Sequence, residues 1–135
     1  MLFRSHPEAF TSGNDLADFQ SSPPMSDDAP VHRFITAIRK ASKPVVAAVA
    51  GVAVGIGTTM LLHCDLVYAS TSARFQLPFV PLGIVPEFGS TLLLPLLAGD
   101  QRAAELLLLG EPFTAEQARD AGIVNAVVPD RKSVV

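Results

Sequence analysis

Cys64 is the only cysteine of this 135-residue chain, and tryptophan is absent. One cysteine cannot form a disulfide within the chain or supply a cysteine-based metal cluster, and such usage fits a reducing compartment. Only 17% of the residues are charged and 7% are aromatic, whereas 49% are hydrophobic. The chain can therefore bury a core, and its length predicts a single domain over residues 1–135.

Basic residues are few and scattered along the chain. The formal net charge is -3 at pH 7, and Lys and Arg form no cluster in the sequence. Because nucleic-acid binding depends on a basic surface, nucleic acid is not expected as a partner. The N-terminal residues 1–7 are too short and too polar to be expected as a secretory signal peptide.

Residues 44–64 form a segment without any formal charge. About 20 apolar residues suffice to cross a bilayer, so a membrane span must be considered. Pro44 opens the segment, Gly51, Gly55 and Gly57 interrupt it, and no aromatic belt marks its ends. These features favour a buried segment of a globular protein, and we expect no membrane span.

The same segment contains signals for several short elements. Residues 45–49 predict a strand, residues 51–57 a glycine-rich turn, and residues 58–63 the start of a helix. With a following strand at 65–69, this is a βαβ-like succession that favours parallel pairing. A strand, a glycine-rich turn and a helix N-terminus can together bring backbone N–H groups into a cavity.

The rest of the chain predicts a further alternation of helices and strands. Before residue 44 we expect a strand at 2–4, a loop over 7–26, and a helix that has Val31, Phe34, Ile35 and Ile38 on one face and ends before Pro44. After residue 69 we expect an extended piece at 74–77, a loop over 78–88, and a helix over 101–109 between Asp100 as N-cap and Gly110. The last two elements are a helix that begins with a Thr114–Gln117 capping box and ends at Gly122, and a strand at 123–128. The strands at both ends have unpaired edges, which predicts part of a larger domain.

Three loops carry the candidate chemistry. Residues 9–16 read AFTSGNDL, residues 51–57 read GVAVGIG, and residues 79–90 read FVPLGIVPEFGS. Together with CDLVYA at 64–69, their order and spacing resemble the crotonase (enoyl-CoA hydratase/isomerase) family, and most nearly its monofunctional Δ3,Δ2-enoyl-CoA isomerases. The resemblance covers nearly the whole chain, about the middle half of a usual family domain. It implies an α/β fold of the ClpP/crotonase type, a spiral of ββα units, incomplete at both ends.

The resemblance also implies an oxyanion hole. In the family, two backbone N–H groups hold the thioester oxygen of a coenzyme A substrate as it becomes an enolate, and the matching donors are those of Asn14 and Ile56. Such donors stabilise the charge by roughly 3–4 kcal/mol each. The coenzyme A-facing loop would comprise Ser12, Gly13, Asn14, Asp15 and Leu16. From the second motif alone, its glycines could equally serve close strand–helix packing; the first loop in register favours the oxyanion hole.

Glu87 is the candidate catalytic carboxylate of the third motif. An ordinary alternative is a solvated glutamate in the first turn of a helix, where the helix dipole favours it. The neighbouring Val85, Pro86 and Phe88 instead predict partial desolvation, which raises the pKa of a carboxylate toward that of a useful base. The resemblance implies that Glu87 moves the proton.

Two departures from the family pattern select among its reactions. Family hydratases carry glutamates where this chain has Thr59 and Phe79, and neither a hydroxyl nor a phenyl ring accepts a proton near neutral pH. A 1,3-proton shift needs only one base. We therefore expect isomerisation of 3-enoyl-CoA to trans-2-enoyl-CoA in fatty acid oxidation. Hydration, another acyl-CoA reaction of the family, or a fragment without catalytic function remain alternatives.

The resemblance implies no metal or redox cofactor, because the coenzyme A thioester is the substrate. His63 and Cys64 are adjacent but lack the further ligands of a metal site, and Asp65 is expected to cap or pair locally. Family members assemble as trimers or pairs of trimers, which we expect of the full-length protein. A cytoplasmic location follows if the source is bacterial; mitochondrial and peroxisomal locations are open alternatives.

Overall fold

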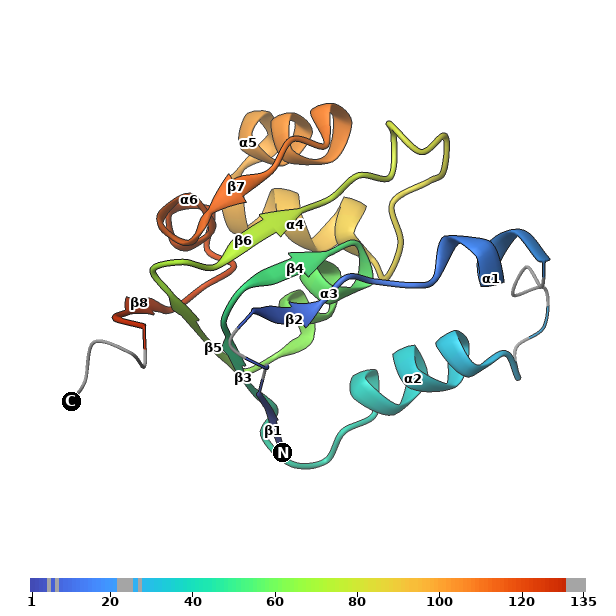
Figure 1. Ribbon diagram of the computed structural model, residues 1–135, viewed down its shortest axis with the longest axis horizontal. Helices are drawn as coiled ribbons and strands as arrows, with labels where there is room; N and C mark the ends of the chain where they lie inside the picture. Colours follow the sequence, from blue (N-terminus) through green and yellow to red (C-terminus); the bar gives the residue numbers. More distant parts are fainter. Residues whose placement is uncertain (5, 7, 22–25, 27, 131–135) are drawn as a thin grey trace.

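Two four-stranded sheets form the centre of the molecule (Figure 1). The structure is a computed structural model that describes residues 1–4, 6, 8–21, 26 and 28–130. The first sheet has the order β1-β3-β5-β8, made of β1 (Leu2–Arg4), β3 (Val46–Val49), β5 (Leu66–Ser70) and β8 (Ala126–Val128). The second has the order β2-β4-β6-β7, made of β2 (Ala9–Thr11), β4 (Val52–Val54), β6 (Arg74–Gln76) and β7 (Phe113–Thr114). All pairs are parallel except the antiparallel β6–β7 pair.

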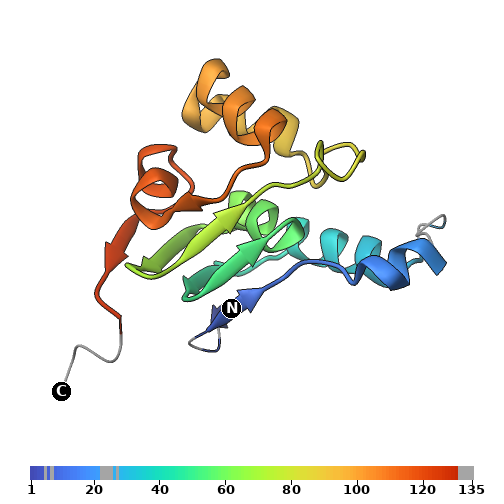
Figure 2. The same ribbon diagram turned by 45° about the horizontal axis from the view of Figure 1, so that its top comes forward.

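Helices connect the strands in a repeating order. They are α1 (Leu16–Ser21), α2 (Pro30–Arg39), α3 (Ile56–Thr59), the 3₁₀-helix η1 (Met60–His63), α4 (Ser90–Ala98), α5 (Asp100–Ala104), the π-helix η2 (Glu105–Leu109) and α6 (Ala115–Asp120). The successions β1-β2-α1, β3-β4-α3 and β5-β6-α4 each place one strand in either sheet before a helix. This confirms the predicted ββα units. Helices α1 and α2 extend to one side of the strands, away from α4 and α5 (Figures 1 and 2).

The core follows from the alternation of side chains along the central strands. Ala47 and Val49 of β3 and Val67 and Ala69 of β5 are at most 2% exposed. Residues two apart on a strand point to the same face, so these four side chains form one apolar surface. Their small size allows the adjacent elements to approach closely.

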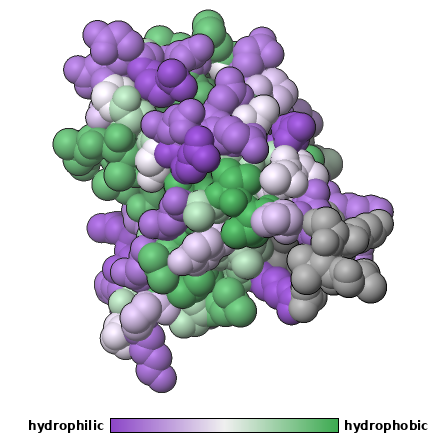
Figure 3. All heavy atoms as spheres, turned by 90° about the vertical axis from the view of Figure 1, so that its left-hand side faces the viewer, coloured by the Kyte–Doolittle hydropathy of each residue, from purple (hydrophilic) through white to green (hydrophobic). Residues whose placement is uncertain are grey.

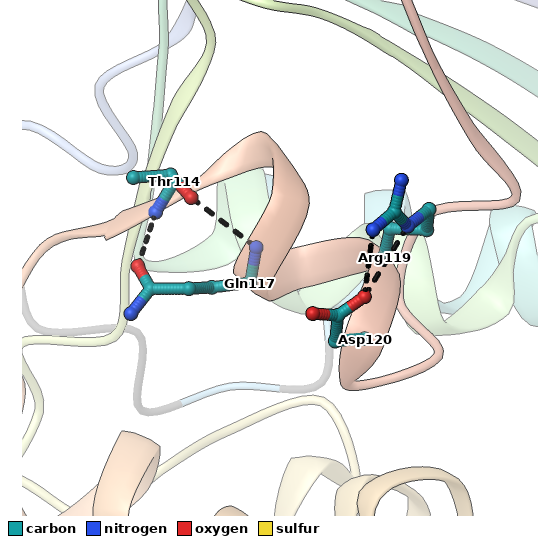
Figure 4. Close-up of polar contacts among 4 residues, drawn as sticks. All are labelled: Thr114, Gln117, Arg119 and Asp120. Carbon is teal, nitrogen blue, oxygen red and sulfur yellow. Dashed lines mark hydrogen bonds and ion pairs between the residues drawn. The ribbon is translucent and has the colours of Figure 1, made fainter.

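Several local predictions are confirmed. Helix α2 ends at Arg39, before Pro44, and buries Ile38. Helix α6 begins with the predicted capping box, in which the Thr114 hydroxyl accepts from the Gln117 N–H at 3.2 Å and the Gln117 side chain accepts from the Thr114 N–H at 2.8 Å (Figure 4). This exchange satisfies two backbone donors and fixes the start of the helix.

Other predictions are wrong, for physical reasons. The loop expected over residues 7–26 contains β2 and α1, although residues 7, 22–25 lie outside the described part of the chain. The turn expected over residues 51–57 contains β4, which pairs with β2 on one side and with β6 on the other, and the helix begins at Ile56 instead of Thr58. These strands are short, and pairing in the sheet outweighs their local turn signals.

The helix expected at residues 101–109 begins differently from the prediction. Asp100 is the first helical residue and Gly99 occupies the N-cap, so the prediction of Asp100 as cap is wrong. Gly110 adopts a left-handed conformation and ends the helical run, as expected, although that run finishes as the π-helix η2. Within the described ranges, no helix is long and apolar enough to span a membrane.

Leucines of α4 and η2 remain exposed. Leu92, Leu96, Leu97, Leu108 and Leu109 are between 50% and 76% exposed. Figure 3, which views the molecule from the left-hand side of Figure 1, shows apolar side chains in patches between polar ones. Extended apolar surface on a protein commonly marks an interaction site, and the described residues leave the leucines of α4 and η2 uncovered.

Replacing Gly57 by alanine tests the close packing of β2 on α3. An added Cβ would lie 2.4 Å from Cγ2 and 2.8 Å from the carbonyl oxygen of Thr11. In an open helix alanine is more stable than glycine by about 1 kcal/mol. Here we expect Gly57→Ala to lower the free energy of unfolding by about 1–3 kcal/mol in urea denaturation, because the crowded core resists the methyl group.

The Thr11→Ser change removes the nearest methyl group and provides the control. Gly57→Ala should therefore lower the free energy of unfolding less in the Thr11→Ser background than in the parent protein. A net gain in stability from Gly57→Ala alone would contradict the packing described above.

Candidate active site

The three sequence motifs converge on one cavity of about 510 Å³. It lies between the loop after β2, the junction of β4 and α3, and the loop before α4. Its lining residues are Ser12, Gly13, Asn14, Val54, Gly55, Ile56, Pro78, Phe79, Leu82, Ile84, Val85 and Glu87. The lining therefore includes all three candidates for chemistry, Asn14, Ile56 and Glu87. Among these lining residues, Glu87 alone has a side chain that can titrate.

The first loop packs directly on the backbone of the second motif. Gly13 has a φ of 89°, and an added Cβ would lie 2.8 Å from the carbonyl oxygen of Val54 and 3.9 Å from Cα of Gly55. A side chain at this position would push the loop away and strain its backbone. The glycine therefore allows the loop that carries Asn14 to lie beside the junction of β4 and α3.

Gly55 sets the orientation of the peptide that contains the Ile56 N–H. Its φ of 58° and ψ of -121° form a combination that residues with a side chain rarely adopt. No atom lies within 4 Å of an added Cβ, so the backbone conformation requires glycine here and space does not. Ile56 is the first residue of α3, and its N–H consequently has no acceptor within that helix.

The predicted coenzyme A-facing loop divides into two parts. Ser12, Gly13 and Asn14 line the cavity, whereas Asp15 and Leu16 are not among its lining residues. An Asp15 carboxylate oxygen accepts from the Ala17 N–H at 2.8 Å, which is the arrangement of an N-cap for α1. Leu16 begins that helix, and its side chain lies outside the described part of the structure.

Glu87 is half-buried in the loop that leads to α4. This helix begins at Ser90, so the alternative of a glutamate in a first helical turn does not hold. The Thr59 hydroxyl donates to a carboxylate oxygen of Glu87 at 3.3 Å. Burial raises the pKa of Glu87, and the hydrogen bond from Thr59 opposes that rise. The carboxylate is thus a stronger proton acceptor than an exposed glutamate.

The two positions expected to lack an acid have apolar or hydroxyl side chains in contact with the site. Thr59 is fully buried and Phe79 is 4% exposed. Sequence reasoning treated Thr59 as a missing acid and missed its hydrogen bond to Glu87. Ser90 was also missed: its N–H and hydroxyl both donate to the Glu87 carbonyl oxygen, at 3.1 and 2.7 Å.

The remaining candidates, Asp65 and Cys64, do not line the cavity. Asp65 accepts from the Val45 N–H at 2.7 Å, and because these residues are 20 positions apart the expected local contact is wrong. Burial, and then the nearby Asp65 charge, raise the pKa of Cys64 to about 11, so this thiol stays protonated at neutral pH and is a poor nucleophile. In the described part of the chain, no group of three or more His, Cys, Asp or Glu side chains is placed to hold a metal ion.

Known proteins are similar to this chain in sequence and in fold. A family model described as enoyl-CoA hydratase/isomerase matches residues 1–135. The 1,2-epoxyphenylacetyl-CoA isomerase of Escherichia coli K12 is 41% identical, with 96% of this chain and 52% of that protein covered. Enoyl-CoA delta isomerase 2 of Rattus norvegicus is 38% identical, with 96% of this chain and 34% of that protein covered.

A solved structure extends the similarity to three dimensions. Pseudomonas aeruginosa OdaA is 53% identical and superposes with a TM-score of 0.91, with 96% of this chain and 52% of that chain covered. The chain thus spans about half the length of OdaA and of the E. coli enzyme. The chain belongs to the enoyl-CoA hydratase/isomerase family and has the crotonase fold.

Proposed function

We propose that the protein is an acyl-CoA isomerase that converts 3-enoyl-CoA to trans-2-enoyl-CoA, as part of fatty acid oxidation, with Glu87 as its single base. One observation carries the proposal: Glu87 is the only titratable side chain among the residues that line the cavity, which also contains Asn14 and Ile56. The positions where family hydratases carry acids hold Thr59 and Phe79.

In the proposed reaction, the substrate thioester oxygen binds to the N–H groups of Asn14 and Ile56. Glu87 removes a proton from C2 of the 3-enoyl group, and the electron pair moves into a dienolate with its negative charge on the thioester oxygen. The two N–H donors stabilise this charge. Glu87 then returns the same proton to C4, which leaves the double bond between C2 and C3.

The environment of Glu87 supports this role. A general base works best when its pKa approaches the working pH, and burial raises the pKa of Glu87 in that direction. The Thr59 hydroxyl holds the carboxylate from one side while the apolar wall limits its hydration. The carboxyl group can therefore hold a proton between its removal from C2 and its delivery to C4.

The rest of the cavity supports an acyl-CoA substrate. Phe79, Leu82, Ile84 and Val85 provide an apolar surface for a hydrocarbon chain, and the loop at residues 12–14 would face the coenzyme A portion. The thioester itself accommodates the developing charge, so the proposed reaction uses no metal or redox cofactor.

We expect the full-length protein to form a trimer or a pair of trimers, and the exposed leucines of α4 and η2 support an interface on this face. The cellular compartment stays a prediction as well: cytoplasmic in a bacterium, or mitochondrial or peroxisomal otherwise.

Comparing two substrates tests the reaction. Purified protein should convert 3-hexenoyl-CoA to its 2-enoyl isomer and leave crotonyl-CoA unhydrated, with products followed by chromatography. Glu87→Gln should lower kcat by roughly 10²–10⁴-fold, because an amide cannot take up the proton. The exposed Glu111 provides the control, and Glu111→Gln should keep the parental rate.

Two other results would support the alternative functions. Hydration of crotonyl-CoA would overturn the isomerase proposal in favour of a hydratase, a reaction that the family also includes. Absence of turnover with both substrates, together with a poorly cooperative thermal melt, would indicate a fragment without catalytic function.

A Thr59→Val variant tests the hydrogen bond to Glu87. The bond lowers the pKa of Glu87, so its loss should raise that pKa and move the acid limb of the kcat–pH profile to higher pH. Thr58→Val is the matched control, since the Thr58 hydroxyl donates to the Ala53 carbonyl at 2.6 Å and has no bond to Glu87. An unchanged acid limb in Thr59→Val would show that the contact does not tune the base.

Stability should depend on pH through the same carboxyl group. Because burial raises its pKa in the folded state, the folded protein holds the proton more tightly, and stability falls as pH rises through the folded pKa. We expect Glu87→Gln to unfold at a higher temperature than the parent at neutral pH, with the difference vanishing below the unfolded pKa. Thermal melts across pH measure this, and Glu111→Gln should show no such gain.

A further inference from the structure

We propose that His63 is a positioning residue for Glu87, holding the backbone turn that directs this side chain into the cavity. The inference rests on the proposed function, in which Glu87 is the base. His63 ends η1 and does not line the cavity itself. It contacts Phe88, the residue that follows Glu87 in the loop before α4.

The contact is a hydrogen bond to the backbone. Nε2 of His63 lies 2.7 Å from the carbonyl oxygen of Phe88. A carbonyl oxygen can only accept, so Nε2 carries the hydrogen and donates it. The preceding carbonyl, that of Glu87, accepts from Ser90, so the carbonyl groups of the two peptides that flank Phe88 are both fixed.

The backbone at this point requires such support. Phe88 has a φ of 56°, a left-handed conformation that is uncommon for a residue with a large side chain, and Gly89 follows with a φ of 69°. An unfavourable conformation of this kind persists when surrounding contacts determine it. The His63 ring also stacks on the Phe88 ring, with 4.1 Å between centroids and 22° between planes. His63 therefore holds both the carbonyl and the side chain of Phe88.

One continuous helical segment brings the relevant groups together. Ile56 opens α3, Thr59 ends it, and His63 ends η1 directly after it. Thr59 and His63 both contact the loop that carries Glu87, so this segment presents one side to the site. Ile56 borders the cavity, Thr59 holds the carboxylate of Glu87, and His63 holds the carbonyl group of Phe88, the residue that follows Glu87. The Glu87 side chain is thus held by α3 through its carboxylate, and the backbone next to it is held by η1 through Phe88.

The matched pair His63→Gln and His63→Met tests the inference. Both variants lose the ring, and both side chains are unbranched and similar in length, but only glutamine retains a donor near the position of Nε2. We expect His63→Met to lower kcat on 3-hexenoyl-CoA by roughly 10- to 100-fold, since small displacements of a catalytic group have effects of this size. KM should stay near the parental value, and His63→Gln should keep most of the rate.

Two further readouts separate positioning from general stability. In His63→Met, the acid limb of the kcat–pH profile should move, because Glu87 is no longer held against Thr59. His32→Met is the control: it removes another histidine–carbonyl hydrogen bond, from His32 to Ser26 at 2.8 Å, and should change neither kcat nor the profile. If His63→Met lacks a cooperative melt, His63→Phe, which keeps the aromatic contact without the donor, replaces it.

The outcomes distinguish the two proposals. If Glu87→Gln is as active as the parent, the proposed function fails. If Glu87→Gln is inactive while His63→Gln and the variant without a donor have equal kcat and the parental pH profile, only the positioning role is overturned. A selective loss of kcat in the variant without a donor supports it.

Discussion

The close approach of two backbone segments is the constraint on which the site depends. The loop after β2 lies against the junction of β4 and α3, and glycines at positions 13 and 57 leave no room for a Cβ between them. An oxyanion hole made of backbone N–H groups cannot be built by exchanging side chains; it requires the two peptides themselves to be close. The ββα repeat supplies this proximity, because β2 and β4 are neighbouring parallel strands of one sheet.

The same helical segment that borders the cavity also organises the proposed base. Thr59 and Glu87 come from elements far apart in sequence, yet their side chains are joined by a hydrogen bond. The proposed oxyanion donor at Ile56 and the support for Glu87 consequently share one helical segment. In a reaction where charge moves from C2 to the thioester oxygen, the base and the donors must keep a fixed separation. A common scaffold meets that requirement better than two independent loops.

Sequence reasoning predicted the parts of the structure that depend on local pattern or on ordered motifs. The capping box of α6, the parallel pairing of β3 with β5, and one cavity shared by Asn14, Ile56 and Glu87 fall in this class. Strands β2 and β4 were missed because they lie in segments whose glycines and polar residues favour turns, and only pairing in the sheet outweighs those local signals. The contacts of Thr59 and His63 with the loop that carries Glu87 could not be predicted either, since they join positions 28 and 25 residues apart.

The position of Thr59 bears on which chemistry the site can support. Its hydroxyl lies within hydrogen-bond distance of the Glu87 carboxylate. An acid at position 59 would place two carboxylates side by side, and like charges at that distance cannot both ionise. One of the two would hold a proton at neutral pH. A single free base at Glu87 and a second acid at position 59 are therefore alternative arrangements of this cavity. The hydroxyl favours the first, because it stabilises the ionised carboxylate without competing for its proton.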